Sequence, residues 1–126
     1  TIFKNALKKF IYQKKYEKLL KKYLKTKNVC LWGASLFLEE FLNKNKINNS
    51  NIIGIIDTNP EKQGKIIENC KVYSPAQIKE LNPKYILLTI KNNNEQRYID
   101  VQNFIAENKI DAILLLNVFE GEPIYD

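Results

Sequence analysis

The chain has 126 residues, close to the length of one domain, with a formal net charge of +6 and no histidine. This length suffices for one hydrophobic core but is short for a complete two-domain dehydrogenase or transferase. Without histidine the chain lacks Ser-His and Cys-His nucleophile pairs, an imidazole general base and histidine-based zinc sites. We therefore assign no catalytic residue and no metal ligand from the sequence, and whether the chain is an enzyme stays open.

Most of the positive charge lies in residues 1–27, which contain ten lysines and one acid for a net charge of +9, while residues 28–126 carry −3. The apolar residues of this segment recur at spacings of three and four, which predicts a basic amphipathic helix over residues 1–27. The apolar positions are Phe3, Leu7, Phe10, Ile11, Tyr16, Leu19, Leu20, Tyr23 and Leu24.

This predicted helix has several candidate partners. Aromatic and leucine side chains opposite lysines suit an anionic membrane surface, and the same apolar face could pack on a neighbouring domain or on a second subunit, as in a homo-oligomer. We favour an ordinary docking helix with a solvated lysine face. Because the basic charge belongs to this one segment, we expect no binding to nucleic acid.

Neither a signal peptide nor a membrane span is expected, because no run of about 18 apolar residues is present and lysines interrupt the N-terminal apolar positions. We therefore expect a cytoplasmic protein. Cys30 and Cys70 lie 40 residues apart, without the spacing of a zinc or redox motif. We interpret them as two reduced thiols, and a disulfide between them is the unsupported alternative.

The body of the chain, residues 28–126, alternates between predicted strands and helices, which indicates an α/β protein with a parallel sheet covered on both faces. The strands are nearly continuous apolar runs, as strands buried on both sides should be. We predict strands at 29–32, 52–57, 72–73, 85–90 and 112–116, and helices at 35–46, 75–81 and 95–108.

The most informative stretch is residues 28–57, where a strand, a glycine, a helix and a second strand ending in an acid follow one another. Gly33 lets the backbone turn sharply after the first strand, and Asp57 follows 24 residues later, near the spacing of about 20 in dinucleotide-binding sites. This order predicts a Rossmann-like open parallel sheet. The motif is degenerate, because G-x-G-x-x-G is reduced to its first glycine in residues 33–38.

In an open parallel sheet, ligands bind beyond the carboxyl ends of the strands. The segments that follow these strand ends here are residues 33–35, 57–59 and 89–91. Ser35 could cap the helix and donate to a phosphate oxygen, Asp57 could accept hydrogen bonds from ribose hydroxyls, and Lys91 could add charge for a phosphate. The predicted cofactor contacts are Gly33, Ala34, Ser35, Asp57, Thr58 and Thr89. The alternative is that the turn, the cap and the loop acid only stabilise a fold that has lost its ligand.

Residues 31–35, 53–64, 71–75 and 85–89 carry a resemblance to a known group of proteins. From residue 28 onward, over about 90 of the 126 residues, the chain resembles Rossmann-like nucleotide-binding modules of bacterial surface-polysaccharide and nucleotide-sugar biosynthesis proteins. It is similar to the N-terminal domain of nucleotide-sugar dehydratase and dehydrogenase relatives and to the C-terminal domain of sugar C-methyltransferases. The resemblance implies that NAD, a nucleotide sugar or a related nucleotide contacts Gly33, Ser35 and Asp57.

Two functional hypotheses follow. The first is a module that binds NAD or a nucleotide sugar within or beside a surface-glycan or sugar-nucleotide biosynthesis enzyme, with catalysis supplied by another domain or subunit. The second is a non-enzymatic docking or oligomerisation domain with a degenerate Rossmann fold, whose basic helix binds another subunit. Asp57 favours a ribose without a 2′-phosphate, because its carboxylate would repel that group.

Overall fold

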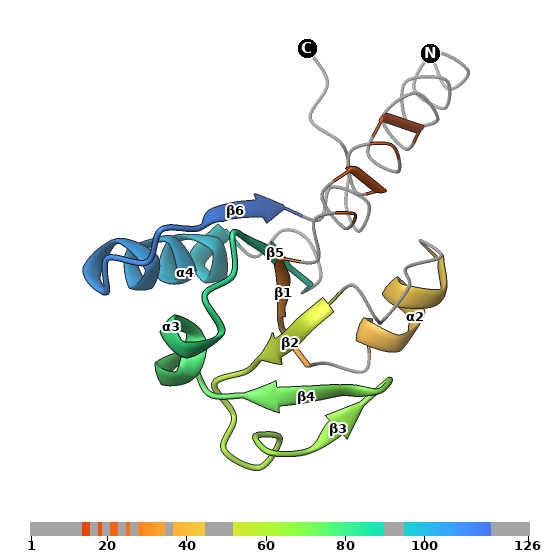
Figure 1. Cartoon of the computed structure of the whole chain (residues 1–126), viewed down its shortest axis with the longest axis horizontal. Helices are drawn as coiled ribbons and strands as arrows, with labels where there is room; N and C mark the ends of the chain where they lie inside the picture. Colours follow the sequence, from red (N-terminus) through yellow and green to blue (C-terminus); the bar gives the residue numbers. More distant parts are fainter. Residues whose placement is uncertain are drawn as a thin grey trace.

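A computed structural model describes residues 28–34, 37–44, 52–89 and 95–116, and six single positions in the N-terminal segment. Within these residues, six strands form one sheet in the order β3-β4-β2-β1-β5-β6 (Figure 1). The strands are β1 (Val29–Trp32), β2 (Ile52–Ile56), β3 (Ile66–Ile67), β4 (Cys70–Tyr73), β5 (Tyr85–Leu88) and β6 (Ile113–Leu116). The helices are α2 (Phe37–Lys44), the 3-10 helix η2 (Pro75–Gln77), α3 (Ile78–Leu81) and α4 (Glu95–Glu107).

Five of the strands are parallel, and their spatial order is that of a Rossmann sheet. In chain order the parallel strands are β1, β2, β4, β5 and β6, so the sheet reads third, second, first, fourth, fifth. The order reverses between β1 and β5. At such a switch point the connections leave in opposite directions and open a crevice at the carboxyl ends of the strands. The predicted fold class is therefore confirmed.

Helices cover both faces of the sheet, as expected. On one face, Leu38 and Leu42 of α2 pack with buried residues of β1, β2 and β4. On the other face, Ile78 of α3 and Val101 and Ile105 of α4 pack with a second buried cluster. Figure 1 shows α2 on one side of the sheet and α3 and α4 on the other. The two faces explain why the strands read as continuous apolar runs, because both sets of side chains are buried.

The hairpin of β3 and β4 was not predicted. Ile66 and Ile67 pair antiparallel with Lys71 and Cys70 at the edge of the sheet, and residues 68–69 form the turn with positive φ angles of 50° and 65°. A two-residue turn with both φ angles positive is the usual hairpin connection. Its residues here are Glu-Asn rather than the Asn-Gly that would have signalled it.

The remaining element bounds differ from the predictions by a few residues. The strand predicted over 85–90 ends at Leu88, and the helix predicted over 75–81 begins as the 3-10 turn η2 before α3. Residues 35–36 and 45–46 of the predicted helix over 35–46 lie outside the described residues.

In the N-terminal segment, described positions 14, 15, 18, 21 and 22 are helical, and all five are exposed lysines. The Lys25 N–H donates to the Lys21 carbonyl oxygen at 3.2 Å, an i to i−4 helical bond. The apolar positions of the predicted helix lie outside the described residues, so its docking face stays a prediction.

Candidate functional site

The turn after β1 depends on Gly33, whose φ angle is +124°, a conformation that residues with a Cβ rarely adopt. The Gly33 N–H donates to the Ile56 carbonyl oxygen at 2.8 Å and so extends the pairing of β1 and β2 by one residue. Gly33 and Ala34 are both buried. The glycine thus has the conformational role that the sequence predicted.

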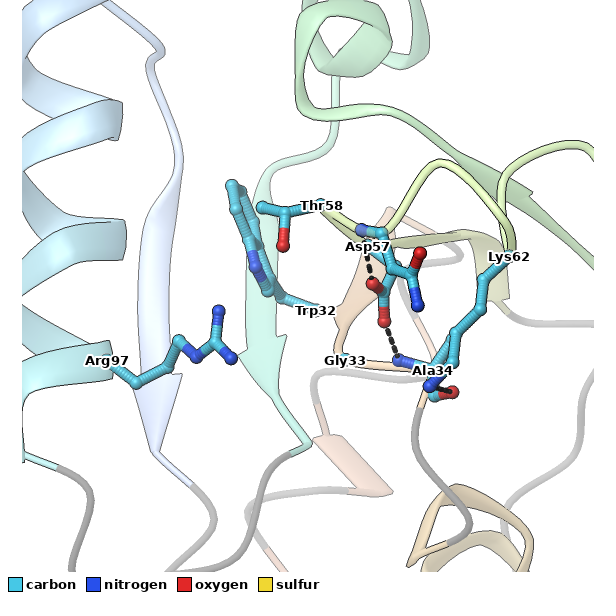
Figure 2. A pocket seen from close by; sticks show the side chains of 8 residues that line it. Trp32, Gly33, Ala34, Asp57, Thr58, Lys62 and Arg97 are labelled. Atoms are coloured by element: carbon cyan, nitrogen blue, oxygen red, sulfur yellow. Dashed lines mark hydrogen bonds between the residues drawn. The ribbon is translucent and has the colours of Figure 1, made fainter.

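Asp57 joins the carboxyl ends of β1 and β2. Its Oδ2 accepts a hydrogen bond from the Ala34 N–H at 2.7 Å, and its Oδ1 accepts one from the Asn59 N–H at 2.8 Å (Figure 2). The first bond bridges two loops that are 23 residues apart in the sequence. Each carboxylate oxygen has a further lone pair, so Asp57 can still accept a hydrogen bond from a ligand hydroxyl.

The loop after β2 is held by its own polar side chains. The Asn59 Oδ1 accepts from the Glu61 N–H at 3.0 Å, and Gln63 Nε2 donates to the Asp57 carbonyl oxygen at 2.9 Å. Lys62 reaches back across the site, where its Nζ donates to the Ala34 carbonyl oxygen at 2.8 Å. Both backbone groups of Ala34 are therefore bonded to side chains of this loop, which fixes the turn after β1.

Thr89 fixes the same turn from the β5 side. It is fully buried, and its Oγ1 lies 3.0 Å from the Trp32 carbonyl oxygen and 2.9 Å from the Gly33 carbonyl oxygen. Its N–H also donates to the Trp32 carbonyl oxygen at 2.9 Å. Thr89 is not among the described residues that line the cavity presented below, and its contact with a cofactor stays a prediction.

A cavity of about 240 Å³ lies beyond the carboxyl ends of β1 and β2. Figure 2 shows it bounded by the Asp57 loop, by Trp32 and by the side chain of Arg97, which extends from α4. Among the described residues that line it, the charged groups are one carboxylate and two cations. The lining residues are Trp32, Gly33, Ala34, Asp57, Thr58, Asn59, Lys62 and Arg97.

Arg97 reaches the cavity because it continues the buried face of α4. Val101 lies four residues later and Phe104 seven residues later, so all three share one side of the helix. Phe104 contacts Trp32 edge to face, with ring centroids 5.6 Å apart and an interplanar angle of 69°. A helix that follows a parallel strand starts at the carboxyl edge of the sheet. Its first turn therefore carries Arg97 to the site while later turns pack on the core.

Of the predicted contacts, Gly33, Ala34, Asp57 and Thr58 lie together in the cavity wall. Ser35 and Lys91 lie outside the described residues. Two further lining residues, Lys62 and Arg97, were not predicted from the sequence. The apolar periodicity of α4, extended by one turn toward its beginning, would have indicated Arg97.

The cysteines do not line the cavity, and both are buried and form no disulfide. Cys30 belongs to the core on the α4 face and Cys70 to the core on the α2 face, so the sheet separates them. Burial raises the pKa of Cys30 to about 12, although a hydrogen bond with the Gly54 backbone opposes this shift. Burial and the nearby Glu68 charge also raise the pKa of Cys70. Neither thiol is poised as a nucleophile.

In the part of the chain that the structure describes, no three histidine, cysteine, aspartate or glutamate side chains gather where a metal ion could bind. None of the helices in this part is both long and apolar enough to cross a membrane.

In a comparison with known protein families, residues 25–112 match the C2185-like, N-terminal family. This match covers well over half of the chain. The chain belongs to the C2185-like, N-terminal family. No curated protein matched this chain.

Solved structures show the same fold at low sequence identity. A UDP-D-quinovosamine 4-dehydrogenase from Vibrio fischeri superposes with a TM-score of 0.53 and 18% identity, over 70% of this chain and 75% of that one. Two structures of RSP, a Rex-family repressor, one in complex with β-NADH, give TM-scores of 0.49 and 0.48 with 20% identity. These matches cover 71% of this chain and 52% of the repressor. At these identities the likeness concerns the fold.

Proposed function

We propose that this chain is a nucleotide-binding module, and that NAD or a nucleotide sugar binds at the carboxyl ends of β1 and β2. The observation that carries the proposal is the position of Asp57. Its carboxylate lies in the wall of a cavity at the strand ends and next to a glycine turn, where a Rossmann sheet binds its ligand. A ribose that donates its hydroxyls to Asp57 would occupy this cavity.

The cavity fits part of a nucleotide. Small-molecule sites usually span roughly 300–1,000 Å³, and the volume here is about 240 Å³. A nucleoside with its first phosphates is therefore a better match to the described walls than a whole dinucleotide. Trp32 and Thr58 offer apolar and hydroxyl surface beside the charged groups.

The wider role that we propose is in surface-glycan or sugar-nucleotide biosynthesis, with the chemistry supplied by another domain or subunit. The resemblance over residues 31–35 and 53–64 supports it. The Vibrio fischeri dehydrogenase, which has this fold and is named for a UDP-sugar, is a precedent for such a role. The described cavity contains no histidine and no thiol, which is consistent with binding rather than catalysis.

A thermal-shift screen of the purified chain tests this proposal. The panel contains NAD, NADP, UDP, UDP-sugars and S-adenosylmethionine, each compared with ligand-free protein. We expect one nucleotide to stabilise the fold by mass action and Asp57→Ala to abolish its shift. NADP should act more weakly than NAD, because its 2′-phosphate would lie near the Asp57 carboxylate. If no nucleotide shifts the transition at saturating concentration, the docking hypothesis replaces this one.

A further inference from the structure

Among the described residues of the glycine turn, the backbone N–H groups of Gly33 and Ala34 already have acceptors within the protein. In a dinucleotide site, backbone N–H groups after the first strand face the pyrophosphate. Here the Ala34 N–H donates to the Asp57 carboxylate at 2.7 Å, so that N–H group is occupied by an anion of the protein itself. A ligand phosphate therefore needs other donors in this cavity.

Two cations line the same cavity. Lys62 comes from the loop after β2, and Arg97 comes from the first turn of α4. Both line the cavity together with Trp32, and Figure 2 shows the Arg97 guanidinium directed toward the Trp32 side. Lys62 Nζ gives one of its three hydrogens to the Ala34 carbonyl oxygen, which fixes the ammonium group and leaves two donors.

We propose that Lys62 and Arg97 form the anion subsite of this module and bind the diphosphate of its nucleotide ligand in place of a glycine-rich loop. This inference rests on the proposed function, because it assigns the phosphates to these two cations and the ribose to Asp57 of the same cavity. Arginine is suited to the task because its planar fork binds phosphate oxygens in pairs, while lysine supplies a point charge. The subsite therefore selects ligands that carry a diphosphate over nucleosides.

The arrangement also gives the missing motif glycines a physical explanation. Those glycines allow a pyrophosphate to approach the backbone and the helix closely. If the diphosphate lies on side chains from the Asp57 loop and α4, no such approach is needed. The sequence accordingly has serine and leucine at the second and third motif positions, 35 and 38.

Calorimetric titration with inorganic pyrophosphate tests the subsite without any nucleotide. We expect the wild-type chain to bind pyrophosphate, and both Lys62→Gln and Arg97→Gln to bind it about tenfold or more weakly. Lys79→Gln is the matched control, because Lys79 is an exposed lysine on α3 outside the cavity. Circular dichroism of each variant checks that the fold is retained. The wild-type affinity should also fall as salt is added.

The inference is overturned if the wild-type chain does not bind pyrophosphate, or if both Gln variants bind it as tightly as the Lys79 control. A parallel titration with UDP, uridine and NAD separates the two proposals. Pyrophosphate binding that depends on Lys62 and Arg97, without binding of any nucleotide, would retain the anion subsite and reject the nucleotide-binding function. Nucleotide binding that is unchanged in the two variants would retain the nucleotide-binding function and reject the anion subsite.

Discussion

At the scale of single residues, the site depends most on the Asp57 carboxylate, which accepts hydrogen bonds from the backbone N–H groups of Ala34 and Asn59. Removing it leaves the N–H of the buried Ala34 without its acceptor. Hydrogen bonds to charged groups contribute about 1.5–3 kcal/mol, and an unsatisfied buried donor costs a similar amount. The same side chain is thus both a structural link and the proposed ribose acceptor.

We therefore predict that Asp57→Ala lowers the free energy of unfolding by about 1.5–3 kcal/mol, measured by urea denaturation. Asp57→Asn should cost less, because its amide oxygen can still accept one of the two hydrogen bonds. Asp111→Ala is the control, since Asp111 is exposed and lies outside the cavity, and it should change stability by less than about 0.5 kcal/mol. Equal stability of Asp57→Ala and the control would contradict the assigned role.

Thr89 tests whether the turn is held from the β5 side. Thr89→Val keeps the side-chain shape but removes the hydroxyl near the Trp32 and Gly33 carbonyl oxygens. We expect a loss of about 1–2 kcal/mol and faster amide hydrogen exchange at Gly33 and Ala34. Thr89→Ser keeps the hydroxyl and removes a methyl group, so it should lower stability by about 1 kcal/mol without loosening the turn. Exchange that is equally fast in both variants would show that the hydroxyl does not hold the turn.

The sequence was enough to predict that four of the lining residues lie together at the strand ends, because a glycine and an acid that end successive strands have a fixed place in a parallel sheet. These residues are Gly33, Ala34, Asp57 and Thr58. Their hydrogen bonds could not be predicted, because spacing does not show that the Asp57 carboxylate turns toward the Ala34 backbone. Arg97 and Lys62 were missed for a related reason. Each is one charged residue among many in the sequence, and only the direction of α4 and the path of the loop bring them to the cavity.

At the scale of elements, the contact between β2 and β4 requires a glycine at position 54. A Cβ on Gly54 would lie 2.6 Å from Cε2 and 2.8 Å from Cδ2 of the Tyr73 ring, closer than real side chains approach. The pairing of β1 and β2 is also irregular just before this residue. Tyr73 thus packs in the space that the missing side chain leaves. The sequence predicted the strand over 52–57 but gave no sign of this ring.

We predict that Gly54→Ala destabilises the fold by about 1–3 kcal/mol through overpacking. The cost should shrink when the same substitution is made in a Tyr73→Ala background, because the clashing ring is then absent. Gly64→Ala is the comparison. Gly64 has no atom within 4 Å of its added Cβ but has a φ angle of +85°, so its cost of about 1–2 kcal/mol comes from the backbone.

For Gly64→Ala, the cost should be the same in both backgrounds. Denaturant unfolding of the four single and double variants, together with the Tyr73→Ala parent, measures the coupling energy. Additive effects of Gly54→Ala and Tyr73→Ala would contradict the close contact.

At the scale of the whole molecule, the alternation of strands and helices predicted the sheet and its two covered faces, because strands buried on both sides have a recognisable composition. The edge hairpin was missed because its strands are short and Ile66 is exposed. Burial in the core also makes the stability of the fold depend on pH, because it raises the pKa of the Cys30 thiol.

We predict that the fold loses stability at alkaline pH partly through Cys30. Its pKa is about 12 in the folded chain against an ordinary value of 9.0, so the folded state keeps its proton longer than the unfolded state. The contribution is fully present below about pH 9 and is lost as the pH rises toward 12, at up to about 1.4 kcal/mol per pH unit.

Urea denaturation of the wild type and of Cys30→Ala at about pH 8 and pH 10.5 measures this contribution. The stability advantage of the wild type should shrink by about 1–2 kcal/mol between the two pH values. An advantage that is the same at both would contradict the raised pKa.

Nucleotide binding at the carboxyl ends of β1 and β2 is tested most directly by titrating isotope-labelled protein. The binding is monitored in ¹H–¹⁵N correlation spectra. With the nucleotide selected by the thermal screen, or with NAD and UDP-sugars at high concentration, we expect saturable shifts at Gly33, Ala34, Thr58, Asn59 and Arg97. Amides of the β3–β4 hairpin should not move. Saturable shifts confined to other parts of the molecule, or no saturable shift with any nucleotide, would contradict the account.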